Sequence, residues 1–66
     1  MEPVRIFKNA KFYCGRESLD DAQWELECIA RSWRKNGGII IEHNDSFLIV
    51  SEENAENETI FEIKIQ

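Results

Sequence analysis

The chain has 66 residues, and its 13 acidic and 8 basic side chains give a formal net charge of -5 at pH 7. A chain of this length has room for one domain with a single hydrophobic core. The negative charge disfavours general binding to nucleic acid or to anionic membrane surfaces, because both repel it, and it favours a partner protein with a basic surface. We therefore expect residues 1–66 to form a single small acidic domain.

The first part of the chain predicts β-structure. Apolar residues recur at even positions over residues 4–14, which is the period of a strand with one buried face. Lys8 and Asn9 interrupt this pattern, so the segment is either one bent strand or a short hairpin that turns near Asn9. We prefer the single strand.

A helix is predicted to begin after Ser18 and to end before Gly37. Ser18 can accept a hydrogen bond from a backbone N–H group of the first turn, and Asp21 follows it at the spacing of a capping box. The glycines at 37 and 38 supply a residue that can adopt the left-handed conformation at a helix end. With about 3.6 residues per turn, one side of this helix carries the expected core residues, which are Leu19, Ala22, Leu26, Ile29, Ala30 and Trp33.

The second half of the chain predicts a hairpin followed by a polar loop. Residues 39–43 and 46–50 are rich in β-branched side chains and are separated by Asn44 and Asp45. Whether that turn has two or three residues decides which side chains of the second strand face the helix. Residues 51–58 are polar and acidic, which predicts an exposed loop.

The last predicted strand covers residues 59–65 and alternates cleanly. Phe61, Ile63 and Ile65 are expected to face inward, with Glu62 and Lys64 outward. The predicted order is β-α-β-β-β. This is an α+β domain in which one helix packs on one face of a mostly antiparallel sheet.

The helix also carries an apolar residue on the side opposite its expected core face. Trp24 and Cys28 project there in line with Arg31 and Lys35, and Asp20 and Glu27 flank them. Tryptophan and arginine are the residue types most enriched at binding hot spots. We therefore predict a partner-binding surface, with burial of Trp24 against a neighbouring loop or strand as the alternative. Its residues are Trp24, Cys28, Arg31, Lys35, Asp20 and Glu27.

A second candidate surface is an acidic loop. Its carboxylates could occupy a basic groove, as DNA-mimicking inhibitors do. The alternative is a solvated loop that serves solubility. The loop carries Glu52, Glu53, Glu56 and Glu58.

The chain lacks the motifs of catalysis and of metal binding. Its single histidine, His43, and its two cysteines, Cys14 and Cys28, are spaced neither as a nucleophile–base pair nor as a zinc site. We expect no enzyme activity, no cofactor and no metal. The N-terminal residues do not form a signal peptide and no segment is long enough to span a membrane, so we expect a cytoplasmic protein, in the host cytoplasm if a phage encodes it.

In size, acidity and absence of catalytic motifs, the chain resembles the small inhibitor proteins of phages and mobile elements, among them anti-CRISPR proteins. The resemblance involves no shared motif. It implies a non-catalytic protein-binding module that acts as a stoichiometric inhibitor or regulator of a nucleic-acid-handling protein.

Two alternatives remain for the function. One is a structural or assembly module that homodimerises, or joins a larger complex, through its sheet. The other is a nucleic-acid binder, in which basic residues near the N-terminus act together with three aromatic ones. Those residues are Arg5, Lys8, Lys11, Arg16, Phe7, Phe12 and Tyr13.

Overall fold

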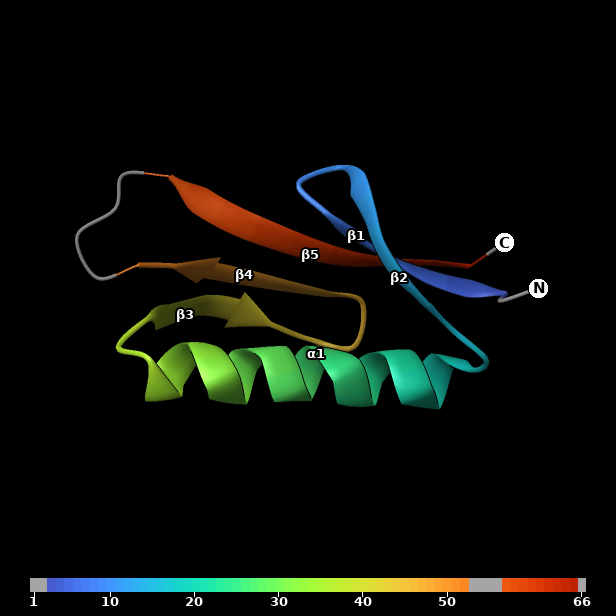
Figure 1. Ribbon diagram of the computed structural model, residues 1–66, viewed down its shortest axis with the longest axis horizontal. Coiled ribbons are helices and arrows are strands. Elements are labelled where there is room, and N and C mark those ends of the chain that lie inside the picture. The colour runs from blue at the N-terminus through green and yellow to red at the C-terminus, as the bar shows by residue number, and fades with distance from the viewer. Residues whose placement is uncertain (1–2, 53–56, 66) are drawn as a thin grey trace.

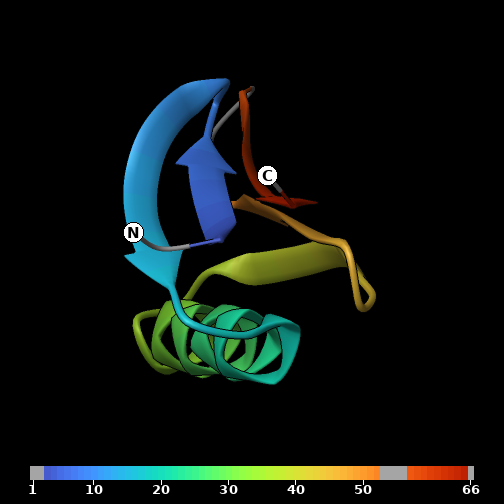
Figure 2. The same cartoon turned by 90° about the vertical axis from the view of Figure 1, so that its right-hand side faces the viewer.

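One antiparallel sheet and one helix make up the domain (Figure 1). Over residues 3–52 and 57–65, which the computed structural model describes, five strands pair in the order β2-β1-β5-β4-β3. The elements are β1 (Val4–Lys8), β2 (Lys11–Arg16), α1 (Leu19–Lys35), β3 (Ile39–His43), β4 (Phe47–Ser51) and β5 (Glu58–Ile65). The predicted α+β class is confirmed, with the element order β-β-α-β-β-β. In Figure 2 the helix lies below the sheet, and the β1–β2 turn is at the end remote from it.

The N-terminal segment is a hairpin, and the single bent strand that we preferred is wrong. Asn9 and Ala10 have φ angles of 51° and 68°, and two consecutive residues in the left-handed region are typical of a two-residue hairpin turn. Asn9 is also tied to β5, because its backbone N–H donates to the Ile60 carbonyl at 2.8 Å and its Oδ1 accepts from the Ile60 N–H at 2.9 Å. These long-range bonds support a turn that the even spacing of apolar residues concealed.

The even spacing of apolar residues did not reveal the turn, because β2 contains an irregularity. Ile6 pairs with Cys14, whereas Phe7 pairs with Phe12, so the register shifts by one residue between these pairs. Tyr13 is the extra residue of this bulge. Phe12 and Cys14, although two residues apart, therefore belong to opposite faces of the sheet.

Both ends of α1 lie where the sequence predicts them. The Ser18 Oγ accepts a hydrogen bond from the Asp21 N–H at 3.2 Å. At the other end Gly37 has a φ of 86°, and the Gly38 N–H donates to the Trp33 carbonyl at 2.8 Å. A left-handed residue followed by such a bond closes the helix.

The hydrophobic core lies between α1 and the sheet. On the helix it begins at Ala22, since Leu19, the first helical residue, is 40% exposed; our expectation of a buried Leu19 is wrong. Ile65, the last residue of β5, pairs with the buried Val4 on the expected inner side, but it is 68% exposed because it lies at the end of the sheet. The buried apolar residues are Val4, Ile6, Ala22, Leu26, Ala30, Leu48, Val50 and Phe61.

The β3–β4 loop settles which face each β4 residue takes. Three residues separate the strands, and the Asn44 Oδ1 accepts from the backbone N–H groups of Ser46 at 2.8 Å and Phe47 at 3.0 Å. With this loop Leu48 and Val50 are buried under α1, so Phe47 and Ile49 face the opposite side. We call that side, which α1 does not cover, the outer face.

Trp33 is a core residue, as predicted. Its indole N–H donates to the Ser51 carbonyl at 2.9 Å, and its ring meets the Phe61 ring edge-on with 6.4 Å between centroids. Gly38 allows this position: a Cβ atom there would lie 2.0 Å from the Trp33 Cδ1 atom. The indole thereby joins the end of α1 to β4 and β5.

Candidate functional site

The outward side of α1 presents a large, isolated aromatic side chain. Trp24 is 63% exposed, and within the described part of the chain it makes no hydrogen bond and no ring contact. The alternative in which Trp24 is buried against a loop or strand is therefore not what the structure has. An exposed tryptophan is unfavourable in solution, because its apolar surface remains in water.

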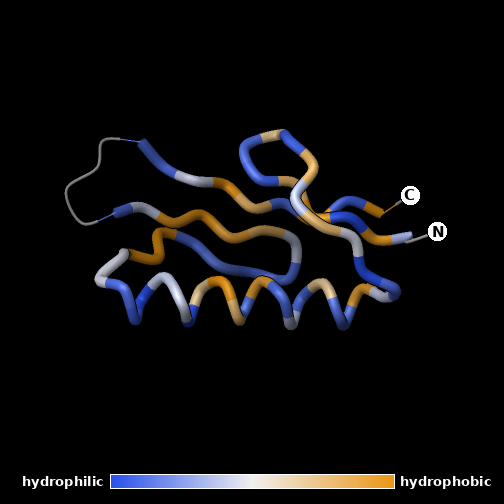
Figure 3. Tube along the Cα trace, in the orientation of Figure 1, coloured by the Kyte–Doolittle hydropathy of each residue, from blue (hydrophilic) through white to orange (hydrophobic). Residues whose placement is uncertain are grey.

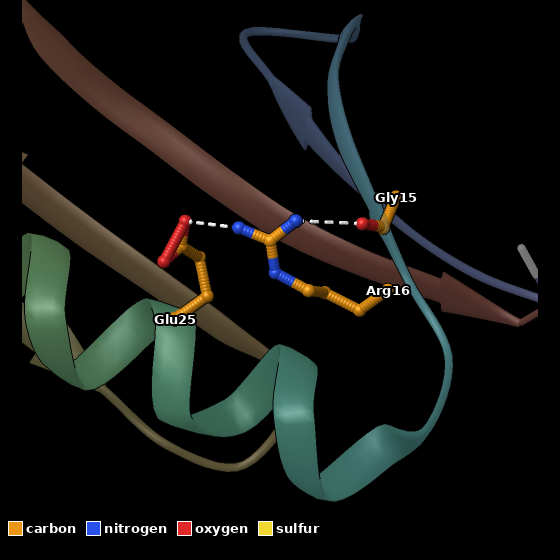
Figure 4. A network of polar contacts seen from close by, with 3 residues as sticks. All are labelled: Gly15, Arg16 and Glu25. Atoms are coloured by element: carbon orange, nitrogen blue, oxygen red, sulfur yellow. Dashed lines mark hydrogen bonds and ion pairs between the residues drawn. The ribbon is translucent and has the colours of Figure 1, made fainter.

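The residues on either side of Trp24 anchor the helix to the strands. The Glu25 Oε1 forms an ion pair with Arg16 Nη2 at 2.6 Å, and Arg16 Nη1 donates to the Gly15 carbonyl at 2.7 Å (Figure 4). The Gln23 side chain donates to the Asp45 carbonyl at 3.3 Å. These contacts hold the orientation of α1, and Trp24 projects from the side they leave free.

Charged residues surround Trp24 along the helix. The first turn contains Asp20 and Asp21 and the last turn contains Arg34 and Lys35, so the surface changes from acidic to basic along its length. Cys28, one turn after Trp24, is half-buried. The other residues of the predicted surface are exposed, namely Asp20, Glu27, Arg31 and Lys35.

The acidic loop is described only in part. Glu52 and Glu58 are exposed at the ends of β4 and β5. Glu53 and Glu56 lie outside the described residues. The prediction that these four carboxylates act together stays a prediction.

The outer face of the sheet is a second apolar surface. Phe47 and Ile49 are half-buried on it, and Ile60, which pairs with Ile49, is exposed. At the β3 edge Ile39 and Ile41 are exposed as well, and Figure 3 shows hydrophobic residues along β4 and at the start of β3. A register shift between Ile40 and Glu42 in β3 leaves Ile41 without a strand partner.

Basic and aromatic residues meet at the β1–β2 hairpin. On the outer face Phe7 and Phe12 pack edge-on with 6.1 Å between ring centroids. The Arg5 guanidinium lies 5.8 Å from the centre of the Phe12 ring, and Lys64 Nζ lies 5.1 Å from that of Phe7. Arg16, which sequence reasoning placed in this group, is instead paired with Glu25.

Sequence reasoning did not include Lys64 in this group. The pairing of β1 with β5 sets Arg5 opposite Lys64, although 58 residues lie between them in the chain. The alternating pattern around Lys64 correctly predicted that it faces outward, and only the strand order shows which residue it faces.

The strand order separates the single histidine from Cys14. His43 ends β3 at one edge of the sheet, and Cys14 lies in β2 at the other edge. Over residues 3–52 and 57–65, no three His, Cys, Asp or Glu side chains are placed to hold a metal ion.

Comparison of the chain with protein-family models, with curated proteins and with solved structures gave no match. Among the described residues, no helix has the length and apolar character needed to cross a membrane. The function must therefore be inferred from the outward side of α1, the outer face of the sheet and the β1–β2 hairpin.

Proposed function

We propose that this domain is a non-catalytic protein-binding module that docks through the outward side of α1. The observation that carries the proposal is Trp24, 63% exposed in the middle of a helix that packs on the sheet. Its neighbours Glu25 and Gln23 contact β2 and the β3–β4 loop, so the stretch of helix that carries the indole is already held in place. A preorganised anchor loses little conformational entropy when it binds.

The energetics favour Trp24 as the centre of the interface. A tryptophan that becomes buried in a partner's pocket typically contributes at least about 2 kcal/mol, and charged residues at the rim contribute mainly to orientation and association rate. Asp20 and Glu27 on one part of the surface, and Arg31 and Lys35 on the other, suit that role. The partner is expected to offer an apolar pocket flanked by charges of the opposite order.

The mode of action that we propose is stoichiometric inhibition or regulation of a nucleic-acid-handling protein. The net charge of -5 favours a partner with a basic surface, and basic grooves are the surfaces with which proteins hold nucleic acid. Glu52 and Glu58 are exposed and would meet such a groove as DNA mimics do. Phage inhibitors of the anti-CRISPR kind act in this way.

Replacement of Trp24 by alanine should abolish partner capture and leave the fold intact. We expect binding to weaken by about 30-fold or more and the unfolding free energy to change by less than about 0.5 kcal/mol, since the side chain is exposed. The measurement is a tagged pull-down from lysate of the source or its host, read by mass spectrometry, followed by titration of the captured protein.

The matched control is Ile65→Ala, which removes an exposed apolar side chain at the far end of β5. It should leave capture unchanged. A partner that binds equally well after Trp24→Ala and after charge reversal of the acidic loop would contradict the proposal. That charge reversal replaces Glu52, Glu53, Glu56 and Glu58 by lysine.

The apolar outer face favours a second candidate function, assembly of the domain with a second copy. β3 is an edge strand, so its outer backbone groups are open to pairing with another strand. Ile41 is exposed in this strand. If the domain assembles there, sedimentation equilibrium should show a mass that rises with protein concentration. The Ile41→Lys variant should stay a monomer, and Trp24→Ala should associate like the wild type. A monomer at all concentrations would remove this candidate.

A further inference from the structure

The strand register sets like charges opposite each other around the β1–β2 hairpin. Arg5 of β1 pairs with Lys64 of β5, and Lys8 pairs with Lys11 across the turn. Like charges directly opposite in a sheet are destabilising. Two such pairs are unexpected in a domain whose net charge is -5, because in an acidic chain a carboxylate would be expected opposite at least one of these cations.

Over residues 3–52 and 57–65, no carboxylate forms an ion pair with any of these four cations. In the described part of the chain the one salt bridge is Arg16–Glu25. Arg5, Lys8 and Lys64 lie over the rings of Phe12, Phe61 and Phe7, and such contacts leave the positive charge uncompensated. Glu62 is the acidic residue of this region, two residues before Lys64 on the outer face. Among the described residues, the β1–β2 hairpin and the paired end of β5 thus carry these four positive charges and the one negative charge of Glu62.

Aromatic side chains accompany this charge. Phe12 is 58% exposed although it contacts Phe7 and Arg5. Tyr13, the extra residue of the β2 bulge, is also exposed. Lys8 and Lys11 flank the β1–β2 turn, which projects away from α1 (Figures 1 and 2). Arg5 and Lys64 pair nearer the start of β1, on the outer face of the sheet.

We infer that the β1–β2 hairpin, together with Lys64, binds single-stranded nucleic acid. Phosphates would contact the uncompensated cations, and an unpaired base would stack on the exposed Phe12 ring beside the Arg5 guanidinium. Stacking on aromatic rings within a positively charged surface is how proteins bind single strands without sequence preference. An acidic peptide would use the cations but would leave Phe12 unused, so the aromatic residues favour the nucleic acid.

This surface is independent of the helix surface. Trp24 lies on α1, remote from the β1–β2 turn, so Trp24→Ala should leave nucleic-acid binding unchanged. The two proposals can therefore fail separately. If both hold, the domain contacts the protein and the nucleic acid of one complex with different faces.

The test is fluorescence anisotropy with a fluorescein-labelled oligothymidine of about 12 nucleotides, at low salt. We expect a dissociation constant on the order of 10⁻⁴ to 10⁻⁵ M. The logarithm of the affinity should fall with the logarithm of salt concentration with a slope of about -2 to -3, as for contacts with three or four phosphates. Phe12→Ala should weaken binding by about 5- to 100-fold, and Phe12→Tyr should restore it.

Two controls decide between the possible ligands and surfaces. An abasic oligonucleotide of the same length retains the phosphates and should bind several-fold more weakly. Lys8→Gln with Lys11→Gln should reduce the salt slope by about 1.4. The matched change on the helix, Arg34→Gln with Lys35→Gln, removes the same charge and should leave the slope unchanged.

Three results would overturn the inference. One is absence of any anisotropy change at low salt with protein in the high micromolar range. Another is equal binding of the abasic strand or of a polyglutamate peptide, which would make the hairpin a general anion surface. The last is a loss of affinity from the Arg34 and Lys35 substitutions equal to that from the Lys8 and Lys11 substitutions, which would mean that net charge alone determines binding.

Discussion

Gly38→Ala should lower the free energy of unfolding by about 2–4 kcal/mol. The new Cβ atom would lie 2.0 Å from Cδ1 and 2.4 Å from Nε1 of Trp33, so the indole or the backbone has to move. Overpacking of this kind costs about 1–3 kcal/mol, and displacement of the indole also breaks its bond to the Ser51 carbonyl, which is worth about 1 kcal/mol. Urea denaturation followed by tryptophan fluorescence and circular dichroism measures the change.

The neighbouring glycine provides the control. A Cβ atom at Gly37 meets nothing within 4 Å, but its φ is 86°, so Gly37→Ala should cost about 1–2 kcal/mol from backbone strain alone. If the Gly38 effect arises from the indole, it should shrink in a Trp33→Leu background, whereas the Gly37 effect should persist. An unchanged Gly38 effect in that background would contradict this explanation.

Leu26→Ala should destabilise the domain by about 2–5 kcal/mol. Leu26 is fully buried between α1 and the sheet, and truncation of a buried leucine loses its transfer free energy and leaves a cavity. A domain of this size is expected to have a total stability of about 3–10 kcal/mol. The variant should therefore be substantially unfolded at temperatures where the wild type is folded, as thermal denaturation by circular dichroism would show.

Leu19→Ala is the matched substitution on the same helix. Leu19 falls on the same side of the helical period as Leu26 but is 40% exposed, so its removal should cost less than about 1 kcal/mol. Equal effects of the two substitutions would contradict this ranking and would mean that the helix begins to pack on the sheet at Leu19.

The net charge of this domain conceals two surfaces of different character. The net charge of the chain is negative. This charge would exclude nucleic-acid binding only if it were spread evenly over the surface. The strand pairing sets Arg5 opposite Lys64 and Lys8 opposite Lys11 along the β1–β2 hairpin, while Trp24 lies on the helix among charges of both signs. A local potential, rather than the total charge, determines what each surface attracts.

The sequence by itself determined the features that depend on local interactions. Ser18 and Gly37 mark the ends of α1 because a cap requires only groups within a few residues of one another. The α+β class, the buried positions of Leu26 and Phe61 and the packing of Trp33 against the core follow from periodicity, which the chain carries in every short window. The exposure of Trp24 was likewise predicted from its position on the helix.

The tertiary structure decided what depends on residues far apart in the chain. Asn9 turns the first segment into a hairpin through bonds to Ile60, and the bulge at Tyr13 removes the simple alternation that sequence reasoning assumed. Lys64 joins Arg5 only because β5 pairs with β1. Strand partners are chosen by backbone groups that are alike at every residue, and side-chain patterns constrain the face of a strand but not its neighbour.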